Sequence, residues 1–395
     1  MLLIRPVPFS DESLESYIMR LAESNGYIKA SGFWSAIRQT FDKSGIEHFN
    51  IPEKLASVNP YLAKRSSSLR IKALHHLSTL SNLEPLPLLE LAIFRSANPY
   101  CTNAQAVIHN GKTLPRQFIV SSPAICPDCL QESNYIRQIW SFWPYNSCHI
   151  HAKPLINVCS CAEKISVYKD QAIGICQYCN VAYEKLKSTV SNEVDLIIST
   201  WLVGIENHEL PNVSQSHKFG LVLWWLKLRT LDLSEFNSNE FVAFFSDWPN
   251  SFNSFLEQKR DRFLEYGLKP MYQARFKDVY DDILLISAKL PSARLNENIV
   301  LTAIFCFFND NIISKNNEFL SLRINSIEAA LLLNTSTEQI AALVDLGELK
   351  SHIRIKSGEF MNLHQYAFEL GDLFFLWQAG FQTEYSNLSV LTSRW

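Results

Sequence analysis

The sequence has 395 residues, which exceeds what one hydrophobic core usually supports, so two or three domains are expected. Hydrophobic residues make up 47% of the chain and glycines number only 12, a composition that excludes a disordered or loop-rich protein. The net charge of −3 argues against a protein that binds mainly to the phosphate backbone of nucleic acid, and it indicates protein partners first. The longest apolar stretch, near residues 299–308, is about half of what a membrane span needs, and the N-terminus does not resemble a secretory signal. A cytoplasmic protein with no membrane segment is therefore expected.

Residues 1–115 are predicted to form a helical domain. The sequence from Ser10 begins a helix with a serine cap and acidic residues in the first turn, and Gly26 suits a left-handed helix end. Further helices are predicted over residues 33–41, 67–80 and 88–94. A helix-turn-helix and a plain helical bundle both fit this pattern. The apolar stripe of the first helix consists of Leu14, Tyr17, Ile18, Leu21 and Ala22.

Seven of the nine cysteines lie within residues 126–179, spaced C-x2-C-x18-C-x2-H and then C-x-C-x14-C-x2-C. Two closely spaced ligand pairs close a tetrahedral zinc site, because each short turn aims both side chains at a point about 2.3 Å away. Four protein ligands leave no position for a catalytic water, so two structural zinc ions per chain are predicted. The first predicted set is Cys126, Cys129, Cys148 and His151, and the second is Cys159, Cys161, Cys176 and Cys179.

Two other interpretations of these cysteines remain. They could form disulfide bonds, or only one set could bind zinc while the second set has lost that ability. In a reducing cytosol such clusters more often bind metal than form bridges. His149 is an alternative to His151, but the two-residue gap from Cys148 to His151 matches the other ligand pairs. Cys101 and Cys306 have no partner in the pattern and are predicted to be ordinary buried thiols.

The zinc-binding segment is predicted to span residues 116–187. Short ribbon strands are expected over residues 164–168 and 182–186. Aromatic and apolar side chains between the first two ligand pairs are predicted to cover the metal and dock it on a neighbouring domain, although exposed aromatics can instead stack on bases. These side chains are Ile139, Trp140, Trp143 and Tyr145.

Residues 188–395 are predicted to form a large all-α domain, which makes the whole fold mainly α. Helical patterns cover residues 194–201, 221–228, 241–245, 252–256 and 299–308. The recurring tryptophans of this part are interpreted as its core, with a surface patch for a partner as the minority interpretation. They are Trp201, Trp224, Trp225 and Trp248.

A helix-turn-helix is predicted at about residues 326–350. Residues 326–334 and 337–346 have the pattern of two helices joined by a capped turn, and Gly347 ends the second. A DNA-reading helix presents Arg, Lys, Asn or Gln to base edges. This second helix presents Glu338, Gln339 and Asp345 and carries no Arg or Lys, which favours a protein contact.

No motif of nucleotide hydrolysis or acyl transfer occurs in the sequence. A phosphate-binding loop, a dinucleotide-binding glycine turn and a nucleophile elbow are all missing. Asp and Glu are scattered, with no acidic trio in a context typical of a two-metal nuclease. The protein is therefore expected not to be an enzyme.

Several stretches, in this order, resemble the TniQ family of transposition target-selection proteins. They are RPVPFSDESLESYIMRLAESNGY, LPRQFIVSSPAICPDCL, the series Trp140, Tyr145, Cys148 and His151 with Pro154-Leu155, and the later cysteine pairs. The length, the segments GLVLWWL and FFSDWPNSF, the helix-turn-helix and the terminal Ser393-Arg394-Trp395 are similar to the short TniQ of type I-F CRISPR-associated transposons.

The resemblance implies a homodimeric adaptor without catalytic activity. Such an adaptor docks at the crRNA-hairpin end of the Cascade complex with its guide RNA and recruits the AAA+ regulator TnsC for RNA-guided DNA integration, so target DNA is engaged indirectly. The family's zinc ligands map onto the eight positions given above. Guide pairing would supply the sequence specificity.

Two other functions fit parts of the sequence. A TnsD-like member recognises a fixed attachment site directly, and such members are usually longer and more basic. A transcription regulator with a zinc ribbon and a helix-turn-helix would also read DNA, which the acidic balance disfavours.

Overall fold

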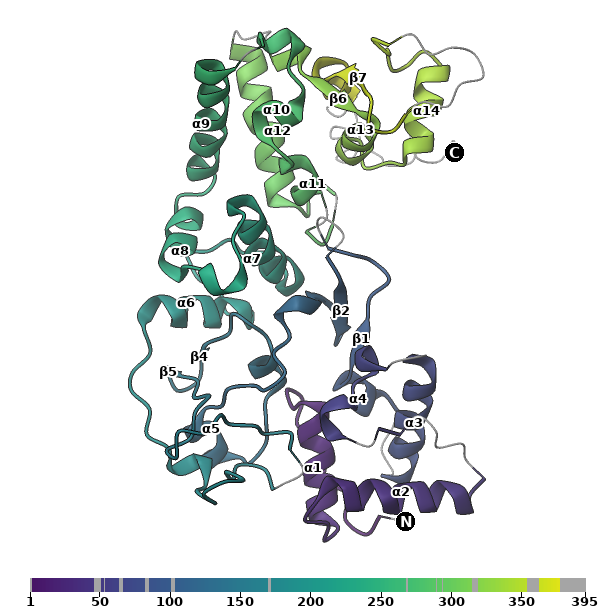
Figure 1. Cartoon of the computed structure of the whole chain (residues 1–395), viewed down its shortest axis with the longest axis vertical. Helices are drawn as coiled ribbons and strands as arrows, with labels where there is room; N and C mark the ends of the chain where they lie inside the picture. Colours follow the sequence, from purple (N-terminus) through teal and green to yellow (C-terminus); the bar gives the residue numbers. More distant parts are fainter. Residues whose placement is uncertain are drawn as a thin grey trace. The chain divides into compact units, whose positions relative to one another are not determined.

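The computed structural model describes most of the chain, and within that part helices dominate and the sheets are small (Figure 1). The predicted mainly α fold is confirmed. Within the described residues, no helix is both long and apolar enough to cross a membrane. The described residues are 2–45, 51–52, 54–63, 67–81, 85–100, 104–169, 172–267, 269–288, 290–292, 294–314, 319–353 and 362–376.

The chain divides into two compact units. Unit 1 comprises residues 1–99 and 104–219, and unit 2 comprises residues 100–103 and 220–395. The helices of unit 1 are α1 (Leu14–Ser24), α2 (Ala30–Lys43), α3 (Ser67–Leu80), α4 (Pro85–Glu90), α5 (Pro127–Glu132) and α6 (Glu193–Leu202). The boundary between the units falls within α7 (Gln215–Arg229). The three-domain boundaries expected from the sequence stay a prediction.

Helix α1 shows how closely the local pattern determines the N-terminal structure. All five residues of its predicted stripe are buried, and Gly26 has a φ of 81°, the left-handed conformation expected at the helix end. The cap is Ser13 and not Ser10, because the Ser13 Oγ accepts a hydrogen bond from the Ser16 backbone N–H at 3.2 Å. The helix therefore begins one turn later than predicted.

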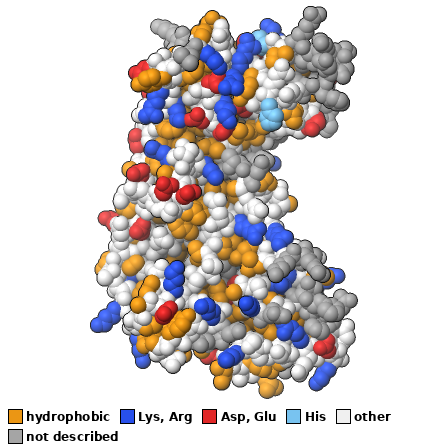
Figure 2. Space-filling model, viewed as in Figure 1, with side chains coloured by type: hydrophobic (Ala, Val, Ile, Leu, Met, Phe, Trp, Pro, Cys, Tyr) orange, Lys and Arg blue, Asp and Glu red, His pale blue; other side chains and the backbone are white. Residues whose placement is uncertain are grey.

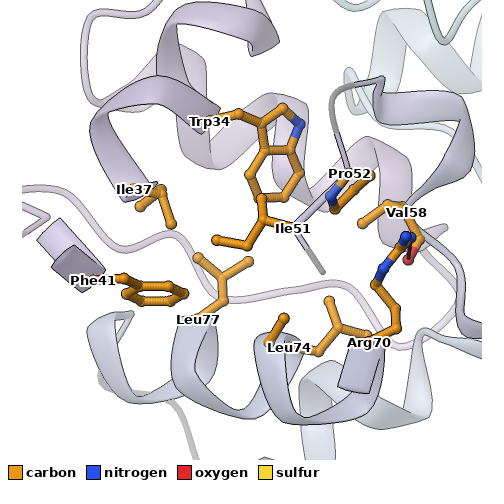
Figure 3. Close-up of a pocket in the computed structure, with 10 residues that line it drawn as sticks. Trp34, Ile37, Phe41, Ile51, Pro52, Val58, Arg70, Leu74 and Leu77 are labelled. Carbon is orange, nitrogen blue, oxygen red and sulfur yellow. Dashed lines mark hydrogen bonds between the residues drawn. The ribbon is translucent and has the colours of Figure 1, made fainter. Parts of the chain in front are cut away.

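Helices α2 and α3 pack their apolar faces together, and α3 has the predicted bounds. Trp34 and Phe41 of α2 face Leu74 and Leu77 of α3 (Figure 3). The cavity left between them is about 10 Å³, room for a single water molecule. This space is core packing and is too small for an organic ligand.

The N-terminal region is not purely helical, which corrects the sequence-based expectation. Residues 88–94 were predicted as one helix, but α4 ends at Glu90 and β1 (Ile93–Arg95) follows. β1 pairs antiparallel with β2 (Ala106–His109), which pairs antiparallel with β3 (Lys112–Pro115). The Ile93 backbone N–H also donates to the Asn59 Oδ1 at 2.7 Å. These long-range bonds override the local helical pattern.

Unit 2 is built on an aromatic core. Its helices after α7 are α8 (Ser238–Ser246), α9 (Asn250–Tyr266), α10 (Phe276–Tyr280), α11 (Ile283–Ser287), α12 (Ile299–Ser314), α13 (Ser326–Leu332) and α14 (Thr337–Asp345). Trp224 lies against Phe244, Phe245, Trp248 and Phe252, and Trp224 is buried. Trp224 and Trp225 are core residues, as predicted, and Trp248 is half-buried. Trp201 is also buried, as predicted, but it belongs to unit 1.

Helices α13 and α14 lie where two helices were predicted, beside a two-stranded sheet. Capping boxes begin both helices, at Asn325 and at Ser336, and Gly347 has a φ of 74° after α14. The sheet pairs β6 (Arg323–Asn325) with β7 (Tyr366–Glu369). Whether the two helices work as a helix-turn-helix stays a prediction.

Candidate metal centres

The first predicted ligand set is assembled by one short helix and one hairpin. Cys126 caps the N-terminus of α5, where Pro127 fits the first helical position, and Cys129 follows within that helix. Cys148 ends β4 (Ser147–Cys148), which pairs with β5 (Lys153–Pro154). His151 lies in the turn between these strands.

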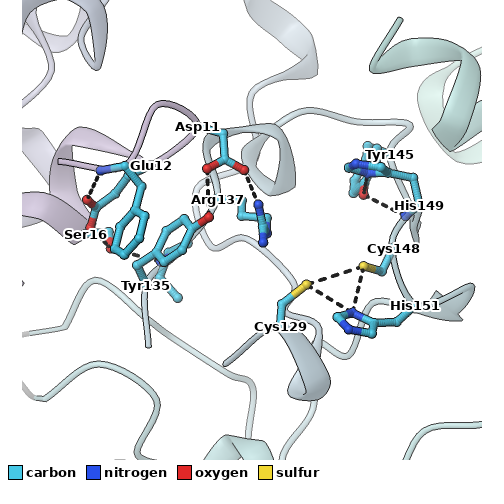
Figure 4. Close-up of polar contacts among 12 residues, drawn as sticks. Asp11, Glu12, Ser16, Cys129, Tyr135, Arg137, Tyr145, Cys148, His149 and His151 are labelled. Carbon is cyan, nitrogen blue, oxygen red and sulfur yellow. Dashed lines mark hydrogen bonds and ion pairs between the residues drawn. The ribbon is translucent and has the colours of Figure 1, made fainter. Parts of the chain in front are cut away.

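The four side chains converge on one point. The Cys129 Sγ lies 3.5 Å from the Cys148 Sγ and 3.3 Å from the His151 Nδ1 (Figure 4). The Cys126 Sγ lies 3.5 Å from the same nitrogen. Ligands at about 2.3 Å from a tetrahedral zinc ion are themselves just under 4 Å apart. All three cysteines are buried. The set therefore suits a zinc ion with the Nδ1 of His151 facing it.

His149, the alternative histidine, belongs to another contact. Its Nδ1 lies 2.7 Å from the Tyr145 Oη, and it is not in the cluster (Figure 4). Burial lowers the pKa of His149, which keeps the imidazole neutral at physiological pH. The two-residue spacing between Cys148 and His151 therefore predicted the histidine that lies in the cluster with the three cysteines.

The second predicted set is assembled by two tight turns. Cys159 N–H donates to the Glu163 carbonyl at 2.9 Å, and Cys176 N–H donates to the Val181 carbonyl at 2.9 Å. Cys159 Sγ lies 3.7 Å from Cys179 Sγ, and Cys161 Sγ lies 3.8 Å from Cys176 Sγ. These separations again suit one tetrahedral ion.

The two clusters differ in burial. Cys159 and Cys176 are buried, whereas Cys161 is exposed and Cys179 is half-buried. Each cluster offers four ligands of the thiolate and imidazole kind that zinc prefers. Together they suit two structural zinc ions.

The strands predicted around the second cluster do not form. Residues 164–168 contribute only an isolated bridge between Lys164 and Val158, and residues 182–186 contain the 3-10 helix η6 (Tyr183–Lys185). The backbone N–H groups of Cys159 and Cys176 donate within the turns that position the cysteines, so they are not available to pair with a longer strand.

The prediction for Cys306 is wrong, because this residue is exposed on α12 and is not a buried thiol. Cys101 lies outside the described residues.

Gly174 and Asn134 join the two clusters. The Asn134 Nδ2 donates to the Ile173 carbonyl at 3.2 Å, and a Cβ on Gly174 would lie 2.7 Å from the Asn134 Oδ1. Gly174 has a φ of 78°, so both its conformation and its neighbour favour glycine.

The loop after the first cysteine pair docks on the start of α1. The Asp11 carboxylate accepts a hydrogen bond from the Tyr135 Oη at 2.8 Å and forms an ion pair with Arg137 (Figure 4). The Ile136 N–H donates to the Ser16 Oγ at 2.9 Å, and Tyr135 stacks on Phe9 with 4.2 Å between ring centroids. The zinc module and the N-terminal helix therefore share one polar and aromatic interface.

Sequence patterns did not reveal the residues that support these clusters. The Glu132 Oε1 lies 2.9 Å from the His151 Nε2, on the far side of the ring from the cysteines. The position of Glu132, one helical turn after Cys129, was the sequence signal that could have identified it as a partner of the site. No sequence signal could have identified the ion pair of Asp11 and Arg137, because these residues lie far apart in the chain.

A third group of possible ligands lies in unit 2, at His352, Glu369 and Asp372. The two ring nitrogens of His352 face different carboxylates, at 3.4 Å from Glu369 and 3.1 Å from Asp372. Arg323 lies 3.2 Å from the same Glu369 oxygen. These side chains contact one another directly, and Arg323 shares the Glu369 oxygen with His352, so the contacts among them account for the cluster without an ion.

Fold and sites together define a mainly α-helical protein with two four-ligand modules suited to zinc. Residues 3–155 match the model of the TniQ family, which confirms the resemblance over this part of the chain. The matched region contains α1 to α5 and the whole first cluster, and it ends before the second. No curated protein matches the sequence. The TniQ family is linked to transposition target selection.

Proposed function

We propose that this protein is a non-catalytic adaptor of transposition target selection. It docks as a homodimer on the RNA-guided Cascade complex, at the crRNA-hairpin end, and recruits the AAA+ regulator TnsC for DNA integration. The observation that carries the proposal is the TniQ match over residues 3–155. The type I-F assignment rests on the further resemblance of segments in residues 220–226 and 244–252 and of the helix pair near residue 330.

The eight clustered residues are proposed as the ligands of two structural zinc ions. Cys126, Cys129, Cys148 and His151 hold the first, and Cys159, Cys161, Cys176 and Cys179 hold the second. Each bound ion would add folding free energy to a segment with little regular secondary structure. The chain's own contribution is to fix the turns and to dock the first cluster on α1.

Acidic side chains on α14 support a protein-binding role for the helix pair. Glu338 and Asp345 are exposed on this helix, which carries no Arg or Lys. A helix with this charge would repel the phosphate backbone if it approached a major groove. The helix pair therefore suits a protein surface better than DNA, and a cytoplasmic location fits a partner bound to guide RNA.

The test of the docking step is reconstitution with purified Cascade. The protein should co-elute with the complex as two copies, because a homodimer offers two attachment points whose joint engagement raises avidity. A single copy in the complex would remove the dimer. Failure to co-elute at micromolar concentrations would contradict the adaptor.

The alternative is a TnsD-like protein that reads a fixed attachment site directly. This alternative requires direct contact with DNA, and the excess of Lys and Arg over Asp and Glu in residues 54–116 is the observation that favours such a contact. A nanomolar, salt-resistant footprint on one defined duplex in the absence of guide RNA would support this alternative.

A further inference from the structure

Basic residues are segregated in the sequence. Residues 54–116 hold eight of the 36 Lys and Arg residues and two of the 39 Asp and Glu residues, in a protein whose net charge is −3. Figure 2 shows Lys and Arg side chains over the part of unit 1 that α2, α3 and β1 form, with few acidic side chains among them on this face. The low overall charge therefore conceals a positive region.

Four of these residues surround the segment formed by residues 54–63. Arg95 ends β1 and its Nε donates to the Tyr61 carbonyl at 3.0 Å, while the Arg116 guanidinium lies 5.8 Å from the centre of the Tyr61 ring. Lys54 begins the segment and is exposed, and Lys72 is exposed on α3, which packs against this segment. We call Lys54, Lys72, Arg95 and Arg116 the basic surface.

The charges of the basic surface are not neutralised by described carboxylates. None of its four residues forms an ion pair with a described Asp or Glu. The polar partners described for Arg95 and Arg116 are neutral, namely backbone carbonyls and the Gln105 amide oxygen at 2.7 Å.

Ten Lys and Arg residues elsewhere in the described chain form ion pairs with Asp or Glu. In unit 2, Lys277 lies 2.8 Å from Asp282, Lys259 lies 2.5 Å from Asp281, and Arg294 lies 3.5 Å from Glu297. In unit 1, Arg20 and Lys153 also have acidic partners. These paired positions provide controls for the basic surface, whose four residues have no ion pair with a described carboxylate.

We propose that the basic surface of unit 1 binds the phosphate backbone of double-stranded DNA without reading its sequence. Clustered Lys and Arg side chains without internal counterions attract phosphates and release the counterions condensed on the duplex. Among the described residues of this stretch no Phe, Tyr or Trp is exposed, so the stacking platform typical of single-strand binding is missing. The choice of DNA rests on the proposed function in transposition.

The test is salt-dependent binding of the isolated full-length protein to a labelled 30-base-pair DNA duplex. Each phosphate contact contributes about 0.9 to the slope of log affinity against log salt. Lys54→Gln with Lys72→Gln should therefore lower the slope by about two and weaken binding about tenfold or more at 50 mM salt. Arg95→Gln with Arg116→Gln should do the same. Since Arg95 supports the Tyr61 segment, melting temperatures of all variants are compared first. The side chains of the two lysines have no described hydrogen bonds, so their replacement should leave the fold unchanged.

The matched control is Lys277→Gln with Arg294→Gln in unit 2, which removes the same charge from paired positions. Its slope should stay within about 0.5 of the parent value. Equal effects of the control and surface variants, or no measurable binding by the parent at 50 mM salt, would overturn the proposal. Tighter binding of a duplex RNA, of single-stranded DNA or of polyglutamate at the same surface would also overturn it. The assay contains neither Cascade nor TnsC, so its failure leaves the adaptor function standing.

Discussion

Glu132 shows how a single side chain outside the ligand pattern can control a metal centre. Its carboxylate lies 2.9 Å from the His151 Nε2, which fixes the ring so that Nδ1 faces the three cysteines. A carboxylate on the second nitrogen of a ligating histidine orients the ring and raises its basicity. The first cluster should therefore depend on Glu132 although Glu132 cannot reach the ion.

Replacing Glu132 by alanine should weaken zinc binding at the first cluster about tenfold, because His151 loses its orienting partner. Competition with a chromophoric chelator measures the change. Glu132→Gln keeps an acceptor and should fall between the parent and the alanine variant, and Glu163→Ala serves as an acidic control. Unchanged affinity in Glu132→Ala would show that the contact does not support the site.

A second residue-scale feature is the buried carboxyl of Glu15. Burial raises its pKa to about 7, and its Oε1 accepts a hydrogen bond from the Asn59 Nδ2 at 2.7 Å. Because its folded-state pKa lies above the unfolded value, the folded state holds this proton more tightly. The contribution of Glu15 to stability is present below about pH 4.5 and is lost as the pH rises through about 7.

Glu15→Gln should remove this pH dependence, since the amide keeps the acceptor for Asn59 and carries no charge. The variant should match the parent at pH 5 and exceed it at pH 8 by about 2–3 kcal/mol in free energy of unfolding, or several degrees in Tm. Comparing variant with parent at each pH cancels the effect of zinc loss. A constant difference across this range would contradict a raised pKa at Glu15.

At the scale of elements, the two zinc clusters have unequal support. The first lies on α5 and the β4–β5 hairpin and docks on α1 through Asp11 and Tyr135, with all three cysteines buried. The second is held by turns and leaves Cys161 exposed. Solvent and chelators therefore reach the second cluster more easily.

Zinc should leave the parent protein in two kinetic phases of one equivalent each, the faster one from the second cluster. Cys176→Ser should retain about one equivalent, released slowly, while Cys126→Ser should lose solubility, because a structural zinc contributes on the order of 10 kcal/mol to the fold of its module. Inductively coupled plasma analysis with a timed chelator assay measures both. Release of both equivalents at one rate, or a soluble metal-free Cys126→Ser, would contradict this ranking.

The elements also show what sequence could and could not predict. Helix α3 has its predicted bounds, since a 3.6-residue period and its ends are local properties. Strand β1 was missed because three residues inside an apolar run give no period, and long-range bonds to β2 and Asn59 decide its form. The ligand spacing found all eight clustered residues, whereas Glu132, Asp11 and Arg137 depend on tertiary contacts that no spacing encodes.

For the whole molecule, the structure combines a region that matches the TniQ family, residues 3–155, with a second helical unit rich in aromatic residues. The TniQ family consists of non-catalytic transposition adaptors, which implies contacts with other transposition proteins. The acidic α14 and the basic surface of unit 1 give the chain two surfaces of opposite charge, which suits the proposed adaptor with partners of different chemistry.

The central claim is that the protein joins RNA-guided target binding to the AAA+ regulator. The most direct measurement is the amount of TnsC retained on immobilised target DNA that carries Cascade and its guide, with and without this protein. TnsC should be recruited only when the protein is present, while DNA binding by Cascade should be unchanged by its omission. Equal TnsC recruitment without the protein, or loss of Cascade from the target when the protein is omitted, would contradict the claim.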